Sequence, residues 1–184
     1  ADQRVIVDQR AATGIDDDRP CCGQAQGKGV QHILRGRGVG QQQNDDLRIE
    51  TMRAQGAYTC LISGGFTLFT NVVAAKVGFQ ENRANQLQIE NGKLTGEVIE
   101  PILGRATKLA TLVELTESFD LDDIDTLVVG DGANDLGMIQ AAGLGVAYHA
   151  KPAVAAAAAV RIDHGDLTAL LYAQGYRRDE FVEG

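Results

Sequence analysis

The chain has 184 residues, of which 44% are apolar and 5% aromatic, and this size and composition suit one globular domain. Its formal net charge is −8. This acidic balance argues against general nucleic-acid binding, which depends on Lys and Arg neutralising phosphates. No stretch approaches the roughly 18 consecutive apolar residues of a membrane span, and the first ten residues lack the apolar core of a signal peptide.

The cysteines are Cys21, Cys22 and Cys60, an odd number without the spacing of a metal site. A disulfide framework is therefore not expected, and the sequence favours a reducing, cytoplasmic setting. An acidic protein that handles a phosphate group would need a bound cation between the two negative charges.

Composition changes sharply near residue 50. Gln, Gly, Asp and Arg make up 28 of residues 1–50, and the apolar runs there are short. Such a segment buries too little apolar area to offset the entropy lost on ordering. We expect residues 1–50 to be disordered or a polar surface extension. The abrupt break also raises a third interpretation, a segment translated from the wrong frame or wrongly joined.

Residues 51–184 show regular alternation of strand and helix patterns. The apolar run over 57–63 predicts a buried strand, and the apolar spacing over 66–78 predicts a helix that ends at Gly78. Asn91-Gly92 predicts a hairpin within 85–99. The later elements continue the alternation: helix 104–118, strand 125–131, helix 134–143, strand 145–150, a helix from Pro152, strand 159–163 and a helix from Asp166 toward Gly175.

This alternation predicts an α/β fold, a Rossmann-like and mostly parallel sheet with helices on both faces. Ligands of such sheets bind at the carboxyl ends of the strands. Ser63 and Asp131 each directly follow a predicted strand, so we expect them at the same edge although 68 positions separate them.

Two features predict a phosphate site. Ser63 and Gly64 open a turn whose hydroxyl and backbone N–H groups precede a helix, where an anion is favoured. Lys108, near the start of helix 104–118, supplies a mobile positive charge for phosphate oxygens. Each feature alone is common, as an ordinary turn or as a solvated surface lysine, so the prediction depends on their combination.

The stretch "GDGANDLG" predicts a magnesium site. It holds Asp131 and Asp135 four positions apart, with Asn134 between them. Carboxylate and amide oxygens suit Mg²⁺. An ordinary helix cap is the alternative, but two glycines and three polar groups exceed what a cap needs. We expect Asp131 to matter more for the metal than Asp135, because it directly follows the strand. A hydroxyl, an ammonium and metal-binding carboxylates together suit phosphoryl transfer.

The stretches "LISGGF", Lys108 and "VVGDGANDLGMIQAAGLGVAYHAKP" resemble motifs II, III and IV of the haloacid dehalogenase-like phosphatases. With "NGKLTGEV" they resemble the phosphoserine phosphatases of that family in particular, over about residues 51–175. The resemblance implies a Mg²⁺-dependent phosphomonoester hydrolase in serine biosynthesis. Its substrate would be a small phosphorylated molecule such as O-phosphoserine, with no nucleic acid or membrane as partner.

The resemblance also implies individual roles. Ser63 and Gly64 would bind the phosphate, and Asn134 would contact the substrate. Lys108 would neutralise phosphate charge and stabilise an aspartyl-phosphate. The first carboxylate of the glycine-rich turn, Asp131, would hold Mg²⁺, and the second, Asp135, would orient the metal shell or Lys108.

The first motif of this family is an apolar strand that ends in Asp-x-Asp-x-Thr and supplies the nucleophile and the general acid/base. This motif is not found here. "TGIDDDRPC" holds Asp16 and Asp18 at the right spacing, but one apolar residue precedes them and Pro replaces Thr. "VIVDQR" offers a strand with a single Asp, Asp8, and has Arg10 in the second position.

We therefore expect the N-terminal strand and the helical cap to be missing or garbled. The 44 residues between Asp18 and Ser63 are fewer than the roughly 60 that four helices and their loops need. The sequence thus predicts a truncated phosphatase with at most trace turnover. The alternative is an inactive phosphate- and Mg²⁺-binding pseudoenzyme or interaction module, whose Gln- and Gly-rich N-terminus would contact a partner. A fragment of a cation-pumping ATPase, which shares the GDGxND pattern, is not favoured because no membrane span is found. The sequence leaves the oligomeric state open.

Overall fold

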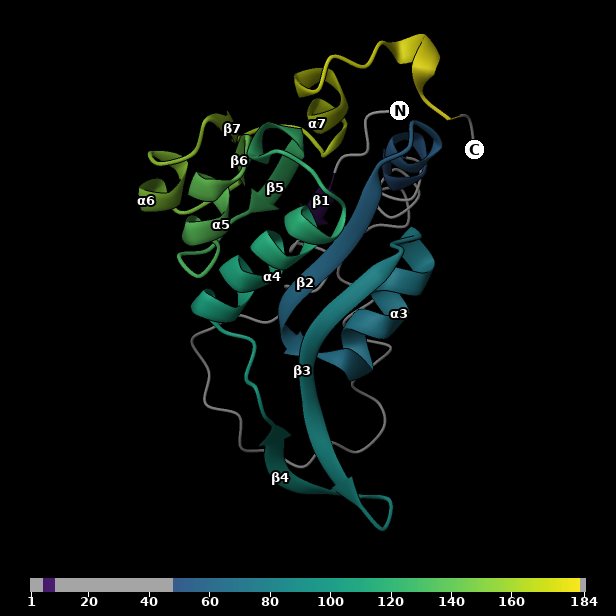
Figure 1. The fold of residues 1–184 in the computed structure, drawn as a ribbon, viewed down its shortest axis with the longest axis vertical. Coiled ribbons are helices and arrows are strands. Elements are labelled where there is room, and N and C mark those ends of the chain that lie inside the picture. Colours follow the sequence, from purple (N-terminus) through teal and green to yellow (C-terminus); the bar gives the residue numbers. More distant parts are fainter. Residues whose placement is uncertain (1–4, 9–47, 183–184) are drawn as a thin grey trace.

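The computed structural model describes residues 5–8 and 48–182 (Figure 1). The described part forms one seven-stranded sheet in the order β4-β3-β2-β1-β5-β6-β7. All neighbouring strands are parallel except β3 and β4, which are antiparallel. The strands are β1 (Val5–Asp8), β2 (Tyr58–Phe66), β3 (Glu81–Glu90), β4 (Lys93–Ile99), β5 (Thr126–Gly130), β6 (Leu144–Tyr148) and β7 (Val160–Ile162).

Helices connect the parallel strands. A further helical segment covers residues 48–54, directly before β2. Among these residues no helix is long and apolar enough to cross a membrane. The helices are α3 (Thr67–Val77), α4 (Arg105–Ser118), α5 (Leu136–Ala141), α6 (Pro152–Ala155) and α7 (Thr168–Ala173), with 3₁₀ turns at η2 (Asp123–Asp125) and η3 (Arg178–Glu180).

The N-terminal strand is present, so the expectation that it is missing is wrong. Val5–Asp8 forms β1 and lies in the middle of the sheet, parallel to β2 on one side and β5 on the other. The apolar run "VIVD" is short, but two neighbouring strands supply hydrogen-bonding partners for its backbone. Residues 9–47, which make up most of the segment expected to be disordered and the place of the expected cap, lie outside the described residues.

Two hydrophobic clusters cover the two faces of the sheet, because alternate side chains of a strand point to opposite faces. On one face Leu61, Val129 and Val146 pack with α3, α7 and the helical segment before β2. On the other face Ile62 and Val128 pack against α4 and α5. This confirms the predicted sheet with helices on both faces.

Residues that favour turns and helix ends correctly predicted where several elements begin or end. Gly78 ends α3 with φ 87°, in the left-handed region that glycine enters without a steric cost. Asn91 and Gly92 turn the β3–β4 hairpin with φ values of 51° and 76°, as expected for this dipeptide. Figure 1 shows that hairpin extending beyond the rest of the sheet. Asp166 was expected to cap α7, but the N-cap position is held by Leu167; Asp166 lies one residue earlier, and its Oδ1 accepts a hydrogen bond from the Thr168 N–H at 2.9 Å.

The helix expected over 134–143 is shorter in the structure, where α5 covers only Leu136–Ala141. Its expected first residues instead form a turn, because Asp135 Oδ2 accepts a hydrogen bond from the Gly132 N–H at 3.1 Å. The glycine-rich stretch thus folds back on itself before the helix begins.

Candidate active site

The carboxyl ends of β2, β1 and β5 lie side by side, and the strand register shows how their residues are aligned. Asp8, the last residue of β1, pairs with Leu61 of β2 and with Val129 of β5. Ser63 and Asp131 each follow these partners by two residues. Because adjacent strands lie about 4.8 Å apart, the ends of β2 and β5 are separated by roughly 10 Å with β1 between them. Ser63 and Asp131 therefore lie at the same edge of the sheet.

The Ser63 stretch differs from the simple turn that was expected. β2 continues to Phe66, and its pairing with β3 shifts register between Ser63 and Phe66. Ser63 is only 3% exposed, and its Oγ accepts a hydrogen bond from the Gly65 N–H at 3.0 Å. The irregular end of β2 thus holds a buried hydroxyl whose own proton remains available to an acceptor.

Lys108 is buried, which excludes the alternative of a solvated surface lysine. It shares the inward face of α4 with Leu112 and Leu115, at spacings of four and seven residues. Its Nζ lies 2.9 Å from Asp135 Oδ1, and the two side chains are 1% and 2% exposed. The structure thus joins the predicted motif III lysine to the predicted motif IV turn by a buried ion pair.

The glycine-rich turn positions Asp135 and Asn134 by leaving room for their side chains. A Cβ at Gly130 would lie 2.7 Å from the Asp135 Cβ, and a Cβ at Gly132 would overlap the Asn134 Oδ1. Glycine at both positions lets Asp135 turn inward toward Lys108 while Asn134 stays exposed. The two glycines therefore have a role beyond that of an ordinary helix cap, because they make room for the Asp135 and Asn134 side chains.

The two carboxylates of the turn differ in what they can do. Both oxygens of Asp135 are engaged, Oδ1 by Lys108 and Oδ2 by the Gly132 N–H. Asp131 follows β5 directly and is partly exposed, and among the described residues no side-chain partner is found for it. Asp131 is therefore the carboxylate better suited to a cation. Within the described part of the chain, no group of three or more His, Cys, Asp or Glu side chains forms a ready metal cluster.

Two candidate residues of the first motif cannot be placed. Asp16 and Asp18 lie outside the described residues. Asp8 is the last residue of the central strand, so among the described residues of the first 50 it is the acidic residue that lies at this edge. The signal that could have favoured it is the apolar run "VIVD", the pattern of a buried parallel strand that ends in Asp.

Sequence reasoning also missed Asn85 of β3. This side chain is 7% exposed and contacts the backbone of both the Ser63 stretch and the segment before α4. No spacing rule distinguishes it from the other polar residues of "ENRANQ", because its two partners lie 18 and 21 positions away.

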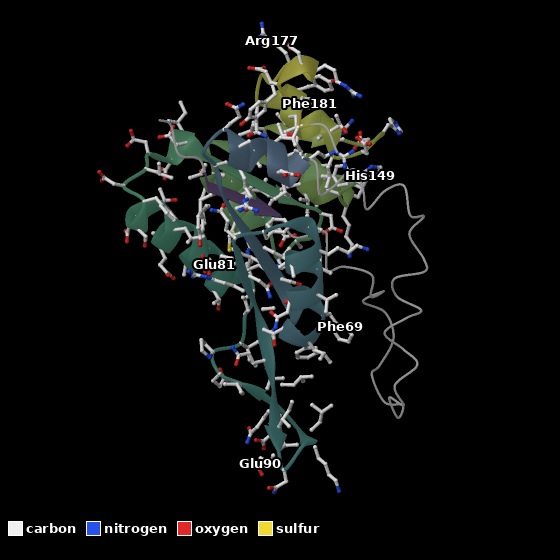
Figure 2. The ribbon with its side chains drawn as sticks, turned by 90° about the vertical axis from the view of Figure 1, so that its right-hand side faces the viewer. Phe69, Glu81, Glu90, His149, Arg177 and Phe181 are labelled. Atoms are coloured by element: carbon white, nitrogen blue, oxygen red, sulfur yellow. The ribbon has the colours of Figure 1, made fainter. Side chains whose placement is uncertain are left out.

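A cluster of charged and polar side chains ties β3 to α4, the helix that holds Lys108. Arg83 binds Glu114 of α4 through two nitrogens, at 2.7 and 2.9 Å, and also pairs with Glu81. Figure 2 labels Glu81 on β3, far from the hairpin tip at Glu90. The Tyr58 hydroxyl donates to Glu81 at 2.7 Å. Burial, and then this hydrogen bond, raise the pKa of Tyr58 above its usual range. Burial also raises the pKa of the neighbouring Cys60 thiol to about 12.

This cluster leads to a prediction about pH. Hydrogen bonds from Arg83 lower the pKa of Glu114 below its ordinary 4.5. The Arg83–Glu114 pair therefore stabilises the folded state fully above pH 4.5. This contribution is lost as the pH falls through the lower pKa that Glu114 has in the folded state. We expect Arg83→Met to lower the free energy of unfolding at neutral pH and to lose much of that effect in acid. Urea unfolding at several pH values measures it.

Arg53→Met is a matched control, because Arg53 donates to the backbone carbonyl of Gly78 and not to a carboxylate. Its effect on the free energy of unfolding should stay constant over the same pH range. An Arg83→Met effect that is equally constant would show that the pair with Glu114 contributes nothing measurable.

Comparison with known proteins decides the family. Residues 47–140, just over half of the chain, match the haloacid dehalogenase-like hydrolases. The chain belongs to this family. A phosphoserine phosphatase of Haemophilus influenzae is 43% identical over 123 residues, which cover 67% of this chain and 39% of that protein. The chain thus spans well under half the length of this curated relative.

Comparison with solved structures supports the same family assignment. A probable phosphoserine phosphatase from Vibrio cholerae superposes with a TM-score of 0.61 at 40% identity, over 67% of this chain and 41% of that one. A phospho-aspartyl intermediate analogue of phosphoserine phosphatase superposes with a TM-score of 0.70 over 94% of this chain and 99% of that one. At 23% identity the second comparison shows a shared fold.

Proposed function

We propose that this chain is a Mg²⁺-dependent phosphomonoester hydrolase that acts on a small phosphorylated substrate of the phosphoserine class, as in serine biosynthesis in the cytoplasm. The observation that carries the proposal is the buried pair of Lys108 and Asp135 at the edge where β2, β1 and β5 end. A buried ammonium held at a strand edge is suited to neutralising the charge of a bound phosphate. The phosphatase core would be residues 51–184 together with β1.

Four residues would bind the substrate. The Ser63 hydroxyl, which already accepts from the Gly65 N–H, can donate its proton to a phosphate oxygen. Gly64 would let the phosphate approach the backbone without a Cβ in the way. Lys108, oriented by Asp135, would neutralise phosphate charge. Asn134 is exposed on the turn after β5 and would contact the rest of the substrate.

The donor set fits a magnesium ion. Asp131 offers a partly exposed carboxylate beside the central strand, and hard oxygen ligands are what Mg²⁺ requires. Asp135 would act through Lys108 and the Gly132 backbone, because both of its oxygens are engaged. When bound, the ion would neutralise part of the phosphate charge, which an acidic chain otherwise repels.

Asp8 is the proposed nucleophile, on the strength of its place at the end of β1. Its carboxylate would attack phosphorus, the ester P–O bond would break, and water would then hydrolyse the aspartyl-phosphate. The leaving alkoxide needs a proton at the first step, and in this chain solvent water would have to supply it. Arg10 stands at the position from which a second Asp would supply it, and a guanidinium does not give up its proton at neutral pH. Slow turnover of phosphoserine is therefore part of the proposal.

The test is Mg²⁺-dependent release of phosphate from O-phosphoserine by the purified chain, compared with three variants. We expect Asp8→Asn to abolish the release and Asp16→Asn and Asp18→Asn to leave it unchanged. Loss of release in Asp16→Asn or Asp18→Asn instead would mean that "IDDDRP" holds the nucleophile. A wild-type chain that neither releases nor binds phosphate in the presence of Mg²⁺ would contradict the proposed function.

Arg10 also favours a second candidate, a pseudoenzyme that binds phosphate and Mg²⁺ without turning over a substrate. The binding residues of the two candidates are the same, so binding alone does not separate them. Phosphate binding without any release from phosphoserine or from an activated ester would support the pseudoenzyme.

A further inference from the structure

Asn85 lies where the β2–β3 pairing becomes irregular. It pairs in register with Phe66, directly after the shift that begins at Ser63. Its side chain is almost completely buried, at 7% exposure. A buried amide costs free energy unless its donors and acceptor are matched by hydrogen bonds. The partners of Asn85 therefore indicate the role of this side chain.

Both ends of the Asn85 amide bind backbone groups of the candidate active site. The Leu103 N–H donates to Oδ1 at 2.6 Å. This contact makes the oxygen face Leu103, and the nitrogen faces the other way. Nδ2 donates to the Gly64 carbonyl oxygen at 2.8 Å. One side chain therefore connects the end of β2 to the segment that enters α4.

The contact with Gly64 also determines the orientation of Ser63. The Gly64 carbonyl and the Gly65 N–H belong to the same peptide unit, which is planar. Asn85 binds this unit at its oxygen, and Ser63 Oγ binds it at its N–H, at 3.0 Å. Because glycine on both sides gives this peptide unit more rotational freedom than other residues would, the hydrogen bond from the Asn85 amide helps to restrain its rotation.

The contact with Leu103 extends the connection to Lys108. Leu103 precedes Gly104, the residue that caps α4, and the Lys108 N–H donates to the Gly104 carbonyl at 3.0 Å. The first turn of α4 is thus attached to the end of β2 through one buried side chain. The attachment therefore joins the strand end that carries Ser63 to the helix that carries Lys108.

We propose that Asn85 is a positioning residue for phosphate binding, which orients the Ser63 hydroxyl and sets its spacing from Lys108. This role rests on the proposed function, because it assumes that Ser63 and Lys108 bind the same phosphate. Asn85 itself acts through the Gly64–Gly65 peptide unit and through Leu103, without touching the substrate.

The first experiment measures binding of inorganic phosphate to the full chain in the presence of Mg²⁺ by calorimetry. Asn85→Leu keeps the size of the side chain and removes both hydrogen bonds. We expect it to weaken phosphate binding about tenfold, the effect of losing one well-placed hydrogen bond. Asn82→Leu is the matched control on the same strand, since the partly buried Asn82 donates to Asn71 of α3 and not to the backbone of the candidate site. It should bind phosphate as the wild type does.

The second experiment measures amide hydrogen exchange in Asn85→Asp and needs no ligand. This variant keeps an oxygen for the Leu103 N–H and replaces the donor to Gly64 with a second oxygen, which repels the carbonyl. We expect the Gly65 amide to exchange at least about tenfold faster than in the wild type, while the Leu103 amide keeps its protection. A purely structural effect would change both amides together.

The outcomes separate the two hypotheses. Unchanged Gly65 exchange in folded Asn85→Asp, or unchanged phosphate affinity in folded Asn85→Leu, overturns the role of Asn85 and leaves the proposed function standing. A wild-type chain that does not bind phosphate overturns the proposed function, whatever the exchange experiment shows. If Asn85→Leu does not fold, the exchange rates of Asn85→Asp decide the question.

Discussion

Lys108→Met is expected to lower the free energy of unfolding by about 3–5 kcal/mol, because it leaves the carboxylate of Asp135 buried without its counter-charge. The ion pair is 1% and 2% exposed, and its Nζ–Oδ1 distance is 2.9 Å. Met has nearly the shape of the lysine stem, so the change removes the charge with little loss of packing. Chemical denaturation followed by circular dichroism measures the effect.

Two further variants make this result interpretable. Lys93→Met replaces an exposed lysine of β4 and should change the free energy of unfolding by less than about 0.5 kcal/mol. In the double variant Lys108→Met with Asp135→Asn, the buried charge is gone on both sides. We expect it to be more stable than Lys108→Met alone, since an amide is less costly to bury than an unpaired carboxylate. Equal stability of the single and double variants would contradict the explanation.

Arg10→Asp is expected to raise the rate of phosphoserine hydrolysis by about 10²–10⁴-fold, the usual contribution of a positioned general acid. In the sequence this residue stands two positions after Asp8, where the resembling family has the second Asp of its first motif. A carboxyl there can protonate the leaving serine oxygen, whereas arginine cannot. Phosphate release at saturating Mg²⁺ is the measurement.

The same variant should have little effect on p-nitrophenyl phosphate, whose phenolate leaves without a proton. Arg19→Asp makes the same charge change elsewhere in the first 50 residues and serves as the control. An equal gain in Arg19→Asp would show that net charge and not proton transfer is responsible. No gain in Arg10→Asp would mean that Asp8 is not the nucleophile or that this segment does not hold residue 10 near the substrate.

Most elements after residue 50 could be predicted because their signals are local. Gly78 ends α3 and Asn91-Gly92 turns the hairpin through backbone conformations that few other residues adopt at low cost. The apolar face of α4 repeats with the helical period, so its range of Arg105–Ser118 was expected almost to the residue. Such features depend on residues within a few positions of one another.

The place of β1 could not be predicted in the same way. "VIVD" has four residues and no local feature that names its partners, and the polar tract after it argued for disorder. Its position follows from β2 and β5, which each offer a row of backbone N–H and C=O groups toward the gap between them. A strand there satisfies both rows at once, and leaving them unpaired in the centre of a sheet is costly.

The sequence by itself determined the alternation of strands and helices, the hairpin, and the residue types of the candidate site. Only the tertiary structure decided that Lys108 is buried against Asp135 and that both oxygens of Asp135 are engaged, whereas the sequence already favoured Asp131 for a cation. The hydrogen bonds of Asn85 with Gly64 and Leu103 could likewise be found only in the tertiary structure. The physical reason is that helical and strand periods specify which face a residue occupies, whereas its partner depends on which other element packs on that face.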